Sequence, residues 1–268
     1  MGEALGRFLA IHAPGRPCSW ARGGAREVMR ALHRAGRAYG CIMDRRDPGR
    51  GSDKPWETPW SGPAWLTRIY DATAWYWGSF VHTQSYGRAY RRLFARLRQG
   101  GWFGQTPSHV LDCGIGAGVL SEAVVRAMGP LDRLVGVDLS PRLLKSAMAC
   151  LRECGVEPRL ARADVRHLPF RDATMDLVTC GLVLDHLGER STALAELARV
   201  ARPGAPVVVV TTRPFAPDLP FRMVFRYARL RPAAVERAMK EAGLRDVQRR
   251  SLTGLARPFG IAFVSRAA

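Results

Sequence analysis

The sequence lacks the features of several protein classes. Its 268 residues contain no apolar run of about 18 residues, so no transmembrane helix is expected. The first 30 residues hold no apolar stretch typical of a secretory signal, and no internal repeat is evident. With 47% hydrophobic and 24% charged residues, the composition excludes collagen, coiled coil and wholesale disorder. The length allows one α/β domain with appendages, or two small domains.

Paired metal-ligating motifs are also missing. The six cysteines are scattered and form no CxxC pair. Cys150 and Cys154 lie four residues apart and should share one face of a helix, but the sequence offers no two further ligands beside them. We therefore expect no metal site, and we expect reduced thiols in a cytoplasmic protein.

Lysine is scarce, because only three of the 41 basic residues are lysines. The formal net charge of +18 divides into +10 for residues 1–100, +1 for residues 101–213 and +7 for residues 214–268. Basic segments on both sides of a nearly neutral middle can attract nucleic acid, an anionic membrane surface or an acidic substrate. Compositional drift towards arginine explains the same excess without any partner.

The chain should divide into three parts. Residues 1–64 form a basic Arg/Gly/Pro-rich extension and linker, with one basic amphipathic helix that could lie on a membrane or cap a domain; a later translation start at Met43 is an alternative. Residues 65–104 form a helical cap with helices near 64–80 and 85–99. Five of the seven tryptophans lie within residues 56–77 and either pack these helices, cover an apolar acceptor or form a membrane-interface belt. Residues 105–268 form the main domain.

Short apolar strands alternate with helices in the main domain. This pattern predicts a parallel sheet with helices on both faces, closed by a hairpin at one edge. The predicted strands are 108–113, 134–137, 159–163, 175–180, 206–211, 246–252 and 259–265. The predicted helices are 117–128, 141–153, 190–200 and 232–242.

A glycine-rich turn follows the first of these strands, in the segment VLDCGIGAG from Val110 to Gly118. Glycine lets the backbone approach a ligand closely, and this turn lies at the edge of the sheet where ligands bind. The dinucleotide fingerprint is GxGxxG, and here the third glycine comes one residue early. The spacing alone is therefore weak evidence.

Acidic residues after the next two strands strengthen the signal. Asp138 follows the second strand, 24 residues after Gly114, where a carboxylate can accept hydrogen bonds from both hydroxyls of a ribose. Asp164 follows the third strand and can meet an adenine amine, while Leu139 and Val165 can sandwich the ring.

With these motifs in order, residues 108–213 resemble the class I S-adenosylmethionine-dependent methyltransferases. A narrower likeness, over about 65–268, is to the ubiquinone/menaquinone-biosynthesis C-methyltransferase family. It depends on the segments YDATA (70–74), SYG (85–87), GLRDV (243–247) and SLTG (251–254). The sequence departs from the family at Trp77-Gly78, at Ala117 and in the stretch 181–186, and the loop after the fifth strand is shorter than usual. The resemblance therefore implies the Rossmann-like, doubly wound, seven-stranded fold, mostly parallel with a last antiparallel strand, and the cofactor, but not the quinone substrate.

The resemblance also implies roles for individual residues. The methionine part of S-adenosyl-L-methionine is held by Asp112 and by the backbone of Gly114, Gly116 and Gly118. The ribose is held by Asp138, the adenine by Asp164, Val165 and Leu139, and Gly181 faces the methyl group.

A general base is needed for some acceptors. His186, in the loop after the fourth strand, is the best-placed candidate, because its unperturbed pKa of about 6.5 suits the role. Asp185 could orient it or act itself, and the alternative is that His186 only packs or caps a helix. Tyr70, Tyr76 and His82 are weaker candidates.

The expected function is methyl transfer to a small, lipophilic acceptor of quinol or phenol type, at carbon or oxygen. The alternatives are N-methylation of a phospholipid headgroup, RNA methylation, and a cofactor-binding subunit without activity. RNA is disfavoured, because residues 181–184 read GLVL in place of the usual Asn/Asp-Pro-Pro-aromatic motif and no RNA-binding module is recognisable. A cytoplasmic enzyme, with possible peripheral contact to an anionic membrane, is expected; the oligomeric state is open.

Overall fold

The computed structural model describes residues 86–129, 131–214, 216 and 227–268. They form a seven-stranded sheet with the strand order β3-β2-β1-β4-β5-β7-β6. Strands β1 to β5 run parallel, β7 runs antiparallel to β5, and β6 runs antiparallel to β7. The predicted sheet with one antiparallel strand in a terminal hairpin is confirmed. The strands span His109–Cys113 (β1), Arg133–Asp138 (β2), Arg159–Arg162 (β3), Leu177–Gly181 (β4), Pro206–Thr212 (β5), Leu244–Ser251 (β6) and Gly260–Ala267 (β7).

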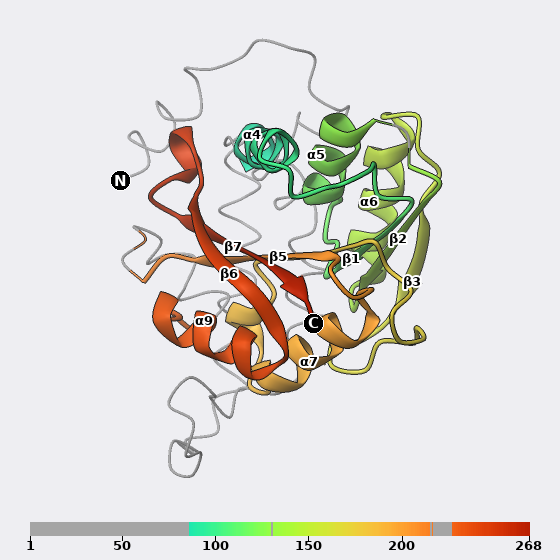
Figure 1. Ribbon diagram of the computed structural model, residues 1–268. Coiled ribbons are helices and arrows are strands. Elements are labelled where there is room, and N and C mark those ends of the chain that lie inside the picture. The colour runs from blue at the N-terminus through green and yellow to red at the C-terminus, as the bar shows by residue number, and fades with distance from the viewer. Residues whose placement is uncertain (1–85, 130, 215, 217–226) are drawn as a thin grey trace, which may run out of the picture. The chain divides into compact units, whose positions relative to one another are not determined.

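Helices cover both faces of this sheet (Figure 1). Helices α4 (Tyr86–Gln99), α5 (Val119–Met128) and α6 (Pro141–Arg152) lie on one face, which we call the α4 face. Helices α7 (Arg190–Val200) and α9 (Pro232–Glu241) lie on the other, the α7 face. Two short 3₁₀ helices, η1 (Leu184–His186) and η2 (Gly254–Ala256), follow β4 and β6.

Strand β5 shows how the sequence pattern produces these two layers. All seven of its residues are buried. Side chains alternate along a strand, so Val207 and Val209 enter the core of the α7 face, while Val208 and Val210 enter the core of the α4 face. Burying a valine contributes roughly 1.5 to 3 kcal/mol. A continuous apolar run is therefore the sequence of a strand covered on both sides.

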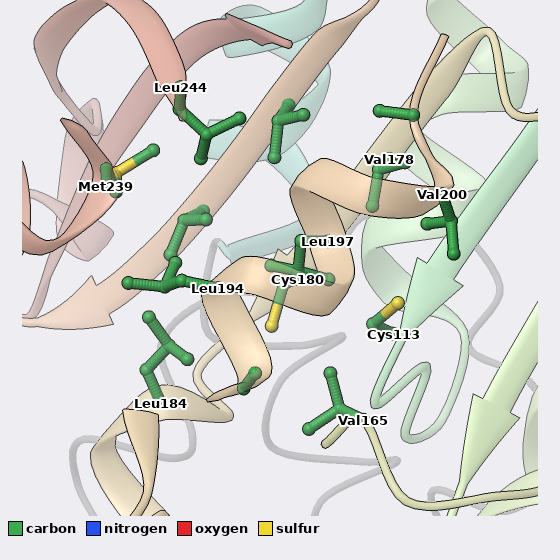
Figure 2. Close-up of a cluster of buried hydrophobic side chains, with 14 of the residues drawn as sticks. Cys113, Val165, Val178, Cys180, Leu184, Leu194, Leu197, Val200, Met239 and Leu244 are labelled. Carbon is green, nitrogen blue, oxygen red and sulfur yellow. The ribbon is translucent and has the colours of Figure 1, made fainter. Parts of the chain in front are cut away.

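The core of the α7 face also contains two cysteines (Figure 2). Cys113 at the end of β1 and Cys180 near the end of β4 both lie among the apolar side chains beneath α7. Both are fully buried and both are free thiols. In the described part of the chain Cys150 and Cys154 are free thiols as well.

Two element boundaries differ from the prediction for identifiable reasons. Helix α5 begins at Val119, not at 117, because Gly118 has the left-handed φ of 86° and cannot be part of the helix. Strand β4 begins at Leu177, not at 175, because Met175 makes only an isolated bridge to Ala201. Helix α6 begins where predicted: Ser140 accepts a hydrogen bond from the Leu143 backbone N–H at 3.1 Å, and Pro141 occupies the first turn.

Several predictions lie outside the described residues: the extension 1–64, the helix near 64–80 with the tryptophan cluster, and the candidates Tyr70, Tyr76 and His82. The proposed division at residues 64 and 104 stays a prediction. Within the described part of the chain, no helix has the length and apolar character that crossing a membrane requires.

Candidate functional site

The glycine-rich turn connects β1 to α5 at the carboxyl end of the sheet. Gly114, Gly116 and Gly118 all have positive φ, at 71°, 54° and 86°. The backbone N–H groups of Gly114 and Ile115 donate to the Val137 carbonyl of β2, at 2.8 and 2.9 Å. These bonds fix the turn against the neighbouring strand, beside Asp138.

The three glycines serve different steric needs. A Cβ atom on Gly114 would lie 2.2 Å from Cγ2 of Val183, and one on Gly118 would lie 3.2 Å from the Ala147 backbone of α6. A Cβ atom on Gly116 would meet nothing closer than the Gly114 carbonyl oxygen, at 3.9 Å. Gly114 and Gly118 therefore allow close packing inside the protein, whereas Gly116 borders open space in which a ligand can approach the backbone.

Asp138, at the end of β2, lies directly beside this open space. One carboxylate oxygen accepts a hydrogen bond from the Gly116 N–H at 2.9 Å, and the other accepts from the Ser140 N–H at 2.8 Å. The side chain is half-buried and positioned by backbone groups on both sides. This geometry matches the place predicted for it after the second strand.

Asp112 lies on the neighbouring strand β1 and is almost completely buried, at 1% exposure. Its two oxygens accept hydrogen bonds from the hydroxyls of Ser121 on α5 (2.6 Å) and Thr179 on β4 (2.9 Å). Burial raises the pKa of the Asp112 carboxyl from 3.8 to about 6, and the two hydroxyls oppose this shift only in part. Asp112 is therefore a buried negative charge at neutral pH that joins β1, α5 and β4.

The third predicted acid, Asp164, is held by a neighbouring arginine. The Arg166 guanidinium donates to both of its oxygens, from Nε to Oδ1 at 3.1 Å and from Nη2 to Oδ2 at 2.6 Å, and also pairs with Glu189 at 3.1 Å. Burial raises the pKa of Asp164, but the hydrogen bonds and charge of Arg166 outweigh burial, so the net shift is downward. Of its predicted companions, Val165 is 5% exposed in the core of the α7 face and Leu139 is half-buried.

The segment after β4 forms the opposite wall of the site. A Cβ atom on Gly181 would lie 3.0 Å from Cδ2 of Leu120, which leaves little room for a larger residue. Leu182 follows with a φ of 60°, a strained conformation for a leucine, and its N–H donates to the Val210 carbonyl at 2.7 Å. Strain of this kind is concentrated at functional sites. The positive φ of Leu182 turns the chain so that Val183 packs against Gly114.

The two predicted catalytic residues follow on η1, but they point to different partners. The Asp185 carboxylate is buried and accepts hydrogen bonds from the Thr212 N–H at 3.0 Å and the Thr212 hydroxyl at 3.2 Å, at the end of β5. The His186 ring is half-buried and packs edge-on against Tyr227, with the ring centroids 5.5 Å apart. Asp185 thus has a structural partner at the end of β5, whereas His186 contacts the ring of Tyr227.

Tyr90 is a buried titratable residue that the sequence reasoning did not single out. It lies on the buried side of α4, is 3% exposed, and stacks in a tilted arrangement on Tyr86 with the centroids 5.6 Å apart. Burial, then the charges of Tyr86, Asp112 and Asp185, raises the pKa of Tyr90 well above its usual value. At neutral pH the phenol is therefore neutral and able to donate a hydrogen bond.

Two possible chemistries find no support in this part of the molecule. Cys180 is fully buried, and burial followed by the charges of Asp112 and Asp185 raises the pKa of its thiol, so it is no nucleophile. Among the described residues, no group of three or more His, Cys, Asp or Glu side chains is arranged to hold a metal ion.

Comparison with known proteins agrees with this geometry. Residues 111–209 match the methyltransferase domain family. The chain is 37% identical over 115 residues to a demethylmenaquinone methyltransferase of Lactiplantibacillus plantarum, covering 42% of this chain and 48% of the relative. It is 35% identical over 105 residues to a ubiquinone/menaquinone biosynthesis C-methyltransferase of Cupriavidus pinatubonensis, covering 39% and 43%. The chain thus spans about half the length of the curated relatives it matches, and its resemblance to them is confirmed.

Solved structures share the fold at low sequence identity. Magnesium protoporphyrin IX methyltransferase from Synechocystis, with bound SAH, superposes with a TM-score of 0.60 at 17% identity, covering 77% of this chain and all of that one. The [4+2]-cyclase SpnF superposes with a TM-score of 0.52 at 18% identity, covering 66% and 80%. The Rossmann-like fold is confirmed, and the second case shows that this fold hosts more than one reaction.

Proposed function

We propose that this protein is an S-adenosylmethionine-dependent methyltransferase that acts on a small lipophilic acceptor of quinol or phenol type. The observation that carries the proposal is the joint placement of the glycine turn and Asp138. Open space borders Gly116, and the carboxylate beside it is fixed by the Gly116 and Ser140 N–H groups. The methyltransferase domain match over residues 111–209 and the quinone-methyltransferase relatives support the same function.

The residues present fit the cofactor. Bound S-adenosylmethionine would supply an electrophilic methyl group on a positively charged sulfur. In the proposed arrangement, Asp138 holds the ribose, Asp164 and Val165 with Leu139 hold the adenine, and the backbone at Gly116 accommodates the methionine part. The ionised Asp112 stabilises the cation from behind the turn, because a buried carboxylate is weakly screened. Gly181, which packs against Leu120, places the end of β4 beside the methyl group.

The acceptor would meet the methyl group between β4 and α4. Transfer forms a bond from the acceptor carbon or oxygen to the methyl carbon and breaks the bond to sulfur, which keeps the electron pair. His186 takes the proton that a phenol or quinol loses, and the neutral Tyr90 phenol donates a hydrogen bond to an acceptor oxygen. Holding the reacting atoms about 3 Å apart and in line is the main contribution of the protein.

The other predicted activities have less support. A cytosine-C5 RNA methyltransferase needs a reactive cysteine, and Cys180 is buried with a raised pKa. N-methylation of a phospholipid headgroup finds no support among the relatives named above. Contact with an anionic membrane remains a separate proposal, consistent with a lipophilic acceptor.

The test uses cofactor with a labelled methyl group. The protein is incubated with it and a cell extract, which is then divided into lipid, RNA and water-soluble fractions. We expect label in the lipid fraction, and none when Asp138→Ala replaces the wild type. Label in RNA would contradict the proposed acceptor class, and no label in any fraction would contradict methyl transfer itself.

A further inference from the structure

A cavity of about 400 Å³ opens on the α4 face, away from the glycine turn, between α4 and the β6–η2 segment. Its apolar wall is formed by α4 and by Trp102, which follows that helix. The polar wall comes from β6 and the residues after it. The lining residues that matter here are Leu93, Leu97, Trp102, Arg96, Arg250 and Thr253.

Strand register directs the arginine of β6 into this region. Arg250 pairs with Ala262 on β7, and Ala262 belongs to the core of the α4 face. Directly paired residues in an antiparallel ladder point to the same face, so the Arg250 side chain faces α4. Its neighbour Arg249 points to the opposite face, where it pairs with Glu236 of α9 at 2.5 Å.

A third arginine reinforces the positive charge. Arg266 on β7 lies over the Trp102 ring, with its guanidinium carbon 5.0 Å from the centroid, and donates to the Gly204 carbonyl at 2.9 Å. Among the described residues, no carboxylate lies within ion-pair distance of Arg96, Arg250 or Arg266. Some arginines elsewhere are paired, such as Arg91 and Arg126 with Glu122, while others, such as Arg159 and Arg237, are exposed like Arg96 and Arg250 but do not line this cavity.

The fold explains only part of this cluster. Arg96 lies in the last turn of α4, where the helix dipole favours a cation. Arg266 is held by the Trp102 ring and the Gly204 carbonyl. Arg250 comes from a strand and donates to the Gln248 side-chain oxygen at 2.5 Å, which leaves its positive charge without a carboxylate at the cavity wall. In addition, the Thr253 hydroxyl at the cavity wall is buried and makes no hydrogen bond to the described residues.

We propose that this cavity binds a phosphate-bearing organic anion, with Arg96 and Arg250 on the phosphate and the Trp102 wall against the apolar part. Guanidinium groups bind phosphate oxygens in a two-pronged geometry that suits a mono- or diester. The volume is within the range of small-molecule sites. The proposal is independent of methyl transfer, because none of these residues borders the glycine turn.

The experiment compares two double variants that remove the same charge. Arg96→Gln with Arg250→Gln alters the cavity, whereas Arg159→Gln with Arg237→Gln removes two exposed arginines from β3 and α9. Each full-length protein is titrated with glycerol 3-phosphate at constant ionic strength and is floated with vesicles of phosphatidylcholine, with or without phosphatidylglycerol. S-adenosylhomocysteine binding serves as the folding control.

We expect the cavity variant to lose at least tenfold in affinity and the control pair to lose less than twofold. Loss with glycerol 3-phosphate identifies a soluble ligand, and loss only with phosphatidylglycerol vesicles identifies a lipid headgroup. Equal losses in both double variants would show that net charge alone attracts the anion and would overturn the proposal. Absence of binding to either probe by the wild type would overturn it too.

Discussion

Two regions of this molecule use charge in opposite ways. At the carboxyl ends of β1 and β2, and just beyond β3, aspartates are held by donors from the protein itself: hydroxyls for Asp112, backbone N–H groups for Asp138, and Arg166 for Asp164. At the antiparallel edge, Arg96, Arg250 and Arg266 gather without a carboxylate among the described residues. A chain with a net charge of +18 thus builds an acidic site suited to a cation and, separately, a basic cavity suited to an anion. Local placement, rather than net charge, decides what each region can bind.

Apart from the loss of Asp138 itself, the largest effect is expected from breaking the acidic site sterically with Gly114→Ala. The added Cβ would lie 2.2 Å from Val183 Cγ2, so the turn has to move. Because displacement by about 1 Å can cost a hundredfold, we expect cofactor affinity in calorimetry to fall about 100-fold while phosphate binding at the cavity is unchanged.

Two matched variants separate the clash from backbone strain. Gly155 has a similar φ of 75° and open space around it, so Gly155→Ala carries only the cost of a left-handed alanine, about 1 kcal/mol. Combining Gly114→Ala with Val183→Ala should restore most of the affinity. Wild-type affinity in Gly114→Ala alone would refute the close packing of these two segments.

A pH titration next tests the acidic site, which is the group formed by Asp112, Asp138 and Asp164. The pKa of Asp112 is about 6, so near pH 5 about nine-tenths of this carboxyl is protonated and the cation loses its counter-charge. We expect cofactor affinity at pH 5 to be about tenfold below that at pH 7.5, whereas binding of phosphatidylglycerol vesicles at the cavity should not weaken, because a phosphodiester keeps its charge over this range. A flat affinity profile in the wild type would place Asp112 outside cofactor binding.

As the pH falls, the contribution of Asp112 to the free energy of unfolding should become more favourable, whereas cofactor affinity becomes weaker. The folded-state pKa of Asp112 lies above its usual value of 3.8, so the folded protein holds the proton that the unfolded chain releases. The penalty of burying the ionised carboxyl, about 3 kcal/mol, is present above pH 6 and is relieved as pH falls towards 4. Denaturant unfolding of wild type and Asp112→Asn across this window distinguishes weaker binding from unfolding.

His186→Ala tests catalysis without touching either charged region. With a phenol or quinol acceptor, we expect turnover to fall at least tenfold, because the base is lost, and cofactor affinity to stay within twofold. Since the ring also packs on Tyr227, His186→Gln serves as a second variant that retains more of the packing. Unchanged turnover in both variants would remove this residue from the mechanism.

The smallest effect is expected at Asp164. Asp164→Asn keeps the shape but weakens the contact with Arg166 and with the adenine amine, so cofactor affinity should fall about fivefold, the value of one hydrogen bond. An analogue with inosine in place of adenosine should bind the variant and the wild type alike. A fivefold loss with that analogue as well would show that Asp164 acts through the loop and not on the base.

Local sequence was sufficient for the strands and helices of the sheet and for the glycine turn, but not for the strand order. Alternating apolar strands, three glycines and an acid after each strand are contained in short segments, and residues 111–209 match the methyltransferase domain family. The partners of Asp112 could not be predicted, because Ser121 and Thr179 come from a helix face and from strand register. Tyr90 and the arginine cavity were missed for the same reason, since each depends on how α4 packs across the sheet.

The central claim is that the acidic site binds S-adenosylmethionine through Asp138. The most direct measurement is calorimetric titration of wild type and Asp138→Ala with the cofactor at pH 7.5, with thermal unfolding as the control for folding. We predict one saturable site in the wild type and no measurable binding in a folded variant. Equal affinity in the two proteins, or no binding by the wild type, would contradict the account.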